Sequence, residues 1–118
     1  MIDHLIRYAD EAEAIADPLV AAYRTEDGWD TSRVIPGVRV YTLGEPVETE
    51  EGPQETREYL PYWYLWIALD ERREDLICMV VADRESRTVL ASLIPPEDWH
   101  LYHCEPVIAG SYYPFGIG

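Results

Sequence analysis

Three side chains that can bind a transition metal lie within five residues of one another in the segment HLYHC: His100, His103 and Cys104. Imidazole and thiolate are preferred ligands of zinc, and the His-x-x-His spacing can bring both rings to one side of a helical turn. A tetrahedral site needs a fourth ligand, for which His4 is a candidate. Because no Cys-x-x-Cys pair accompanies these residues, we interpret them as packing and surface residues and predict no metal and no other cofactor.

The two cysteines, Cys78 and Cys104, could also act as nucleophiles beside a histidine, because such pairs are assembled in space rather than in sequence. Cys78 lies between Ile77 and Met79, where a cysteine usually behaves as a small buried apolar residue. The sequence has no nucleophile elbow, phosphate-binding loop or dinucleotide-binding motif. We therefore predict no catalytic residues and no enzymatic activity, with a metal- or thiol-dependent enzyme as the alternative.

The segment from residue 44 to residue 58, GEPVETEEGPQETRE, combines six glutamates with a single arginine. The glutamates are Glu45, Glu48, Glu50, Glu51, Glu55 and Glu58. So few apolar residues predict a long, mobile acidic loop at the tip of a hairpin. The simplest interpretation is a solvated loop, and the functional one is a row of carboxylates that imitates a nucleic-acid backbone inside a basic groove.

The whole chain is also acidic, with 23 acidic residues against nine arginines and a formal net charge of −14. This charge repels phosphate backbones and anionic lipids, so we predict no direct binding to nucleic acid or membrane. It attracts a protein partner with a basic surface, although acidity can also serve solubility alone. With no export signal at its start and no apolar run of about 18 residues, the chain is expected in the cytoplasm with reduced cysteines.

An uncharged aromatic stretch, PYWYLWIAL, follows the acidic segment. On a strand, Tyr62, Tyr64 and Trp66 share one face, while Leu65, Ile67 and Leu69 share the other. The aliphatic face suits packing against a helix. The Tyr/Trp face is predicted to be mainly core, yet Tyr62, Tyr64 and Trp66 stay candidate partner-binding residues because their polar groups need partners or water.

Alternation and turn residues predict strands at 2–8, 38–43, 59–70, 76–83 and 88–93, with one helical turn near 97–99. Asp10, followed by Glu13, has the pattern of a helix N-cap, and Asp17-Pro18 predicts the start of a second short helix. An apolar stripe is expected on the resulting kinked segment. Its members are Ala12, Ile15, Ala16, Leu19, Val20 and Tyr23. Short polar turns join the later strands, which favours antiparallel neighbours.

The predicted fold class is therefore α+β. We expect a single domain over residues 1–118, built from a twisted antiparallel sheet of about five strands. One kinked N-terminal helical segment is expected to pack on a face of this sheet.

Four stretches carry a resemblance to a known group of proteins: MIDHLIRYADEAEAIADP, DGWDTSRVIPGVRVY, YLPYWYLWIAL and EPVIAGSYYPFG. Together they resemble small uncharacterised proteins encoded in phages and prophages of alphaproteobacteria, often near tail genes. The resemblance implies a viral origin and assigns no functional residue.

Charge and resemblance together predict a non-enzymatic, acidic, phage-type protein-binding module. One form of it is an inhibitor of a basic host complex that handles nucleic acid or provides defence, similar in style to anti-CRISPR proteins. The alternative is a tail-associated structural component or tail assembly helper. Either would be a monomer or homodimer, in the host cell or the virion.

Overall fold

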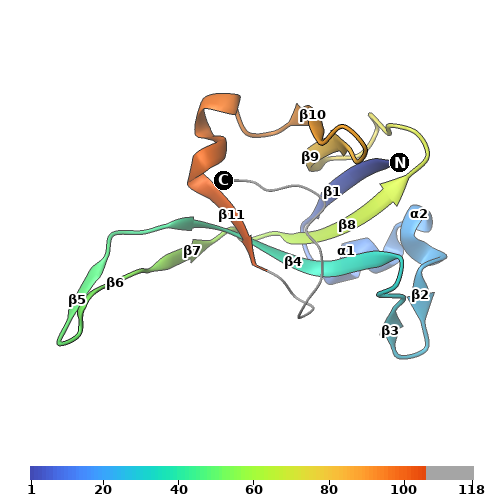
Figure 1. Ribbon diagram of the computed structural model, residues 1–118. Helices are drawn as coiled ribbons and strands as arrows, with labels where there is room; N and C mark the ends of the chain where they lie inside the picture. The colour runs from blue at the N-terminus through green and yellow to red at the C-terminus, as the bar shows by residue number, and fades with distance from the viewer. Residues whose placement is uncertain (106–118) are drawn as a thin grey trace.

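An antiparallel sheet of seven strands organises residues 1–105, which are the residues that the structure, a computed structural model, describes (Figure 1). The strand order is β10-β9-β1-β8-β4-β11, with β7 also pairing with β4. The bounds are β1 (Ile2–Tyr8), β4 (Val34–Leu43), β7 (Arg57–Tyr59), β8 (Trp63–Leu69), β9 (Cys78–Asp83), β10 (Thr88–Ser92) and β11 (Tyr102–Glu105). Residues 106–118 of the predicted single domain lie outside the described residues.

Shorter elements complete the described chain. They are α1 (Glu11–Ala16), α2 (Pro18–Ala21), β2 (Arg24–Thr25), β3 (Gly28–Trp29), β5 (Val47–Thr49), β6 (Gly52–Gln54) and the 3-10 helix η1 (Pro96–Leu101). The pairs β2–β3 and β5–β6 form two separate two-stranded sheets. No helix within residues 1–105 has the length and apolar character that crossing a membrane requires.

Strand β8 is central, between β1 and β4, and both of its faces are buried. On one face Leu65 and Ile67 pack with Ile6 of β1 and with Ala14 and Val20 of the two α-helices. The predicted packing of the aliphatic face against the helical segment is confirmed.

The opposite face of the sheet holds a second core cluster. Tyr64 of β8 packs there with Leu5, Val38 and Ile94. The chain after β10 returns over this face, and the Trp99 indole N–H of η1 donates a 2.9 Å hydrogen bond to the Ile94 carbonyl. The helical turn predicted near residues 97–99 is present as η1.

The helical segment begins and breaks where the sequence predicts. The Asp10 carboxylate accepts a 2.9 Å hydrogen bond from the Glu13 backbone N–H, and Asp17 does the same for Leu19 at 3.0 Å, with Pro18 opening α2. The predicted stripe is wrong in α1. Ala14 is the buried residue of this helix, while Ile15 is 42% exposed. Because the chain turns at Asp17, α1 and α2 do not continue one helical face.

The predicted antiparallel sheet is confirmed, but it is curled and has seven strands where about five were expected, and strands outweigh helices in the described residues, so the fold is closer to a strand-rich one than to α+β. The sequence prediction missed β7 and β11 as separate sheet members and missed the β2–β3 hairpin. Both β7 and β11 are short and carry polar residues, so their pairing depends on the long strand β4 rather than on a pattern of their own.

Candidate partner-binding site on the acidic arm

The acidic segment forms most of a two-stranded arm that projects away from the sheet (Figure 1). We call residues 42–58 the arm: the end of β4, the β5–β6 hairpin and the start of β7. The expected hairpin is present, but the segment contains paired strands rather than one long loop. In the outer part Val47 lies opposite Gln54, and Thr49 opposite Gly52.

A one-residue bulge divides the arm. Leu43 pairs with Arg57 and Val47 pairs with Gln54, so three residues on the outgoing strand face two on the returning strand. The Gly44 N–H donates to the Thr56 carbonyl at 3.0 Å, and the Thr56 hydroxyl donates to the Glu45 carbonyl at 2.8 Å. These bonds join the inner and outer halves. Such a bulge bends a ribbon and increases its twist.

All six glutamates that the sequence singled out lie on this arm and are exposed. Glu50 and Glu51 form the turn at its tip. Among residues 1–105, Glu55 is the one member of the six with a basic side chain within 4 Å, because its Oε1 lies 3.6 Å from Arg57 Nε. The other five carboxylates are therefore available to a partner's cations.

The base of the arm is held by a cluster of stacked arginines and tyrosines. The Arg39 guanidinium lies 3.8 Å from the centre of the Tyr59 ring, and that of Arg57 lies 4.5 Å from the centre of the Tyr41 ring. The two tyrosine rings are 5.5 Å apart, and His103 stacks on Tyr41 at 5.4 Å. Cation–π contacts of this kind fix the planes of both partners.

Glu105 of β11 connects this cluster. Its carboxylate accepts hydrogen bonds from the Tyr59 hydroxyl and from Arg57, the latter at 3.0 Å, and it lies 3.8 Å from Arg39. The hydrogen bond from Tyr59, with smaller contributions from the two arginines, lowers the pKa of Glu105. Three strands thus meet at one carboxylate, and the direction in which the arm leaves the sheet is fixed there. Sequence reasoning missed this cluster because β7 and β11 were not recognised.

The three aromatic candidates have different surroundings. Tyr62 is 44% exposed and carries the Arg7 guanidinium 4.5 Å from its ring centre. Tyr64 is only 1% exposed, so its candidate role as a partner contact is wrong: it is a core residue. Trp66 is half-buried, and its indole N–H donates a 3.1 Å hydrogen bond to Asp3.

The structure does not bring the metal candidates together. His103 and Cys104 are neighbours on β11 and so face opposite sides of the sheet, while His100 lies in η1 and His4 in β1. Within residues 1–105, no three histidine, cysteine or acidic side chains are grouped so that they could hold a metal ion. Burial raises the pKa of Cys104 to about 12 and, with a smaller effect from Asp75, that of Cys78 to about 12. Both thiols are therefore protonated at neutral pH and are weak nucleophiles.

Comparison with protein-family models, with curated proteins and with solved structures finds no match.

Proposed function

We propose that this chain is a non-enzymatic protein-binding module that inserts its acidic arm into a basic groove of a partner protein. The proposal extends to an inhibitor of a host complex that handles nucleic acid, in the manner of nucleic-acid mimics encoded by phages. The observation that carries it is the arm itself: six exposed glutamates on a projecting ribbon, of which Glu55 has an internal ion pair among residues 1–105.

The charge density of the arm supports this proposal. From the Thr42–Glu58 pair to the tip, the arm spans eight residue steps of about 3.3 Å, or roughly 26 Å. Six carboxylates and Arg57 over that length give roughly one net negative charge per 5 Å. One strand of duplex DNA carries about one phosphate per 3.4 Å. A groove built for one strand would therefore meet a comparable charge density on the arm.

The exposed position of the arm also fits a contact site. None of residues 46–54 is buried, so the outer hairpin contributes nothing to either core cluster. An isolated two-stranded hairpin is at best marginally stable in water. The cluster of Arg39, Tyr59 and Glu105 orients the arm before binding, which reduces the entropy lost on association.

The test is a comparison of two charge-matched variants in affinity capture from a lysate of a bacterial host. The arm variant carries Glu→Gln at Glu48, Glu50, Glu51 and Glu55. The body variant carries Glu→Gln at Glu26, Glu71, Glu85 and Glu97, which are also exposed. Both variants lose the same formal charge, so general electrostatic attraction is equal.

We expect the wild type and the body variant to retain the same nucleic-acid-binding proteins. We also expect the arm variant to lose them, and salt at about 0.5 M to release them, because that concentration screens charges beyond a few Å. Retention by the arm variant at the level of the body variant would exclude the arm as the contact.

A further inference from the structure

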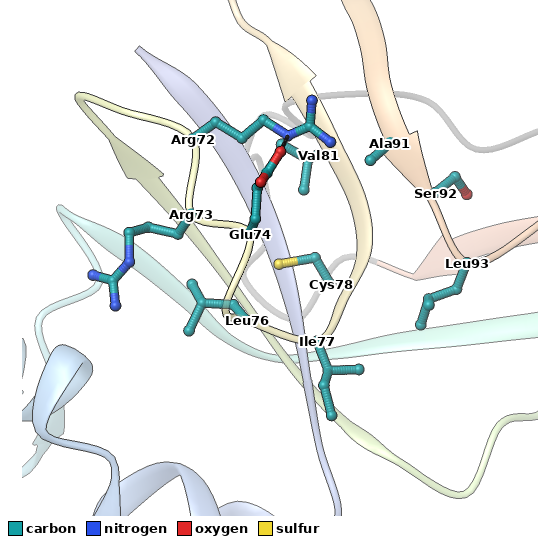
Figure 2. A pocket seen from close by; sticks show the side chains of 10 residues that line it. All are labelled: Arg72, Arg73, Glu74, Leu76, Ile77, Cys78, Val81, Ala91, Ser92 and Leu93. Carbon is teal, nitrogen blue, oxygen red and sulfur yellow. Dashed lines mark ion pairs between the residues drawn. The ribbon is translucent and has the colours of Figure 1, made fainter.

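A cavity of about 320 Å³ lies on the face of the sheet opposite Tyr64, between the segment that joins β8 to β9 and the strands β9 and β10 (Figure 2). We call residues 70–77 the connecting segment. Its residues Arg72, Leu76 and Ile77 line one side, and Val81 and Leu93 line the other. In Figure 2 the Cys78 sulfur points from β9 toward the connecting segment. Access to this thiol therefore depends on where the segment lies.

Two hydrogen bonds tie the connecting segment to β1. The Arg73 backbone N–H donates to His4 Nε2 at 3.1 Å, and the Arg7 backbone N–H donates to the Ile77 carbonyl at 2.7 Å. The charged side chain of Arg73 does not tie the segment to the sheet, because it pairs with Asp75 inside the segment at 2.6 Å. Arg72 likewise pairs with Glu74, at 3.7 Å. The middle of the segment is therefore held to β1 through the His4 ring.

The hydrogen bonds of His4 determine which of its two ring nitrogens carries the proton. The side chain is fully buried, and Nδ1 lies 2.9 Å from the Ile2 carbonyl, which can only accept. Nδ1 therefore carries the hydrogen, and Nε2 is the acceptor for the Arg73 N–H. A neutral ring satisfies both bonds. A second proton on Nε2 would face the Arg73 N–H, donor against donor, and the contact would be lost.

The charged groups around His4 pull its pKa in opposite directions. Burial is the largest effect and lowers the pKa, and Arg73 and Arg72 of the connecting segment lower it further. The bond to the Ile2 carbonyl and the neighbouring Asp3 raise it. Asp75 of the connecting segment also interacts with the ring, because His4 contributes to the lowered pKa of Asp75. The net direction is downward from the ordinary value of 6.5, so the ring is neutral at neutral pH and gains its proton only below that value.

We propose that His4 is an acid-sensitive latch for the connecting segment. In its neutral form it holds Arg73 and keeps the segment against the sheet. Protonation breaks that bond, and residues 70–75 move away from the cavity while Leu76 stays packed on the core and the Arg7–Ile77 bond and the strands persist. The cavity around Cys78 then opens to solvent. This device is independent of the acidic arm and of the proposed function.

Hydrogen exchange measures the latch directly. We expect the protection factor of the Arg73 amide, corrected for the intrinsic exchange rate, to fall on the order of tenfold or more once His4 is protonated, over a pH series from 8 down to the lowest pH at which the chain stays folded, because the amide loses its acceptor. The amides of β8 should keep their protection. An Arg73 protection factor that does not change over this range would overturn the proposal.

Matched variants separate His4 from other titrating groups. His4→Gln supplies an uncharged donor and acceptor, so Arg73 protection should become independent of pH. His100→Gln changes an exposed histidine and should behave as the wild type. If His4→Gln shows the wild-type pH dependence, or His100→Gln abolishes it, His4 is not the latch.

The opening of the cavity can be measured separately, through the reactivity of the Cys78 thiol. In a Cys104→Ala background, Cys78 is the remaining cysteine of the chain. Its rate of reaction with dithiodipyridine, divided by the rate for the urea-unfolded chain at the same pH to correct for the loss of thiolate, should rise severalfold when His4 is protonated. A corrected rate that stays constant or declines as the pH falls would contradict the opening of the cavity, whatever the result for Arg73.

Discussion

Asp3 is a fully buried carboxylate, and its surroundings define the clearest stability prediction at the residue scale. Its Oδ1 accepts from the Trp66 indole at 3.1 Å and from the Arg84 guanidinium at 2.9 Å. Arg84 in turn lies over the Trp66 ring, 4.8 Å from its centre. Among residues 1–105, Oδ2 has no hydrogen-bond partner. Loss of either donor to Oδ1 would leave the buried carboxylate with too few hydrogen bonds.

Trp66→Phe should therefore lower the free energy of unfolding by about 1–3 kcal/mol, because it removes a donor from a buried carboxylate. The matched control is Trp29→Phe, whose indole N–H donates to the exposed Glu11 at 3.3 Å. Urea unfolding of both variants checks the comparison. Equal losses would show that the Asp3 contact contributes nothing beyond the change of ring.

His4 gives a pH dependence of stability with a definite sign. Its pKa is lowered in the folded state, so below pH 6.5 the unfolded chain binds a proton that the folded chain excludes. The free energy of unfolding should fall as the pH decreases from 6.5, and the contribution of His4 should be complete above that value. Carboxylates such as Asp75, whose pKa the Arg73 hydrogen bond lowers to about 2, add their own loss only in stronger acid.

The measurement is the difference in unfolding free energy between the wild type and His4→Gln, taken at pH 7.5 and at pH 5.5. We expect the wild type to lose stability relative to the variant as the pH falls. A difference that stays constant between the two pH values would contradict a lowered pKa for His4.

At the scale of elements, the arm should be separable from the sheet. Replacing residues 46–54 by Asn-Gly would join Glu45 to Glu55 through a two-residue turn in the register that Leu43 and Arg57 already set. Because no residue from 46 to 54 is buried, the free energy of unfolding should change by less than about 1 kcal/mol. Circular dichroism and urea unfolding test this, and loss of cooperative unfolding would show that the arm supports the fold.

Local sequence signals predicted the start and the break of the helical segment and the strands β1, β9 and β10, because caps, prolines and alternation act within a few residues. The buried face of α1 was mispredicted, since the turn at Asp17 rotates α2 away from it. The length of β4, which begins at Val34 rather than at Val38, depends on its pairing with β8 across the sequence. No local pattern contains that information.

The sequence likewise predicted one part of the candidate site and not the other. The six glutamates were found from composition alone, and the structure gathers them on one arm. The cluster at the arm's base combines Arg39 of β4, Tyr59 of β7 and Glu105 of β11, which are up to 66 residues apart in a chain of 118. Side chains so distant meet only through strand pairing, so spacing in the sequence could not have indicated them.

For the whole molecule, the described residues extend 49 × 33 × 26 Å, with the acidic ribbon projecting from the curled sheet (Figure 1). A net charge of −14 acts over the entire surface, whereas the proposed contact uses one arm. The net charge of the whole surface accelerates the encounter with a basic partner, whereas carboxylates that pair with cations in a groove determine the affinity. The two effects on binding therefore differ in how they depend on ionic strength and on which glutamates are changed.

The salt dependence of affinity for a purified captured partner tests the arm most directly. The dissociation constants of the wild type, the arm variant and the charge-matched body variant would be measured by calorimetry across a series of salt concentrations. We predict that the wild type and the body variant share a steep salt dependence, and that the arm variant binds more weakly with a shallower one. Indistinguishable salt dependence and affinity for the two variants would contradict the acidic arm as the binding site.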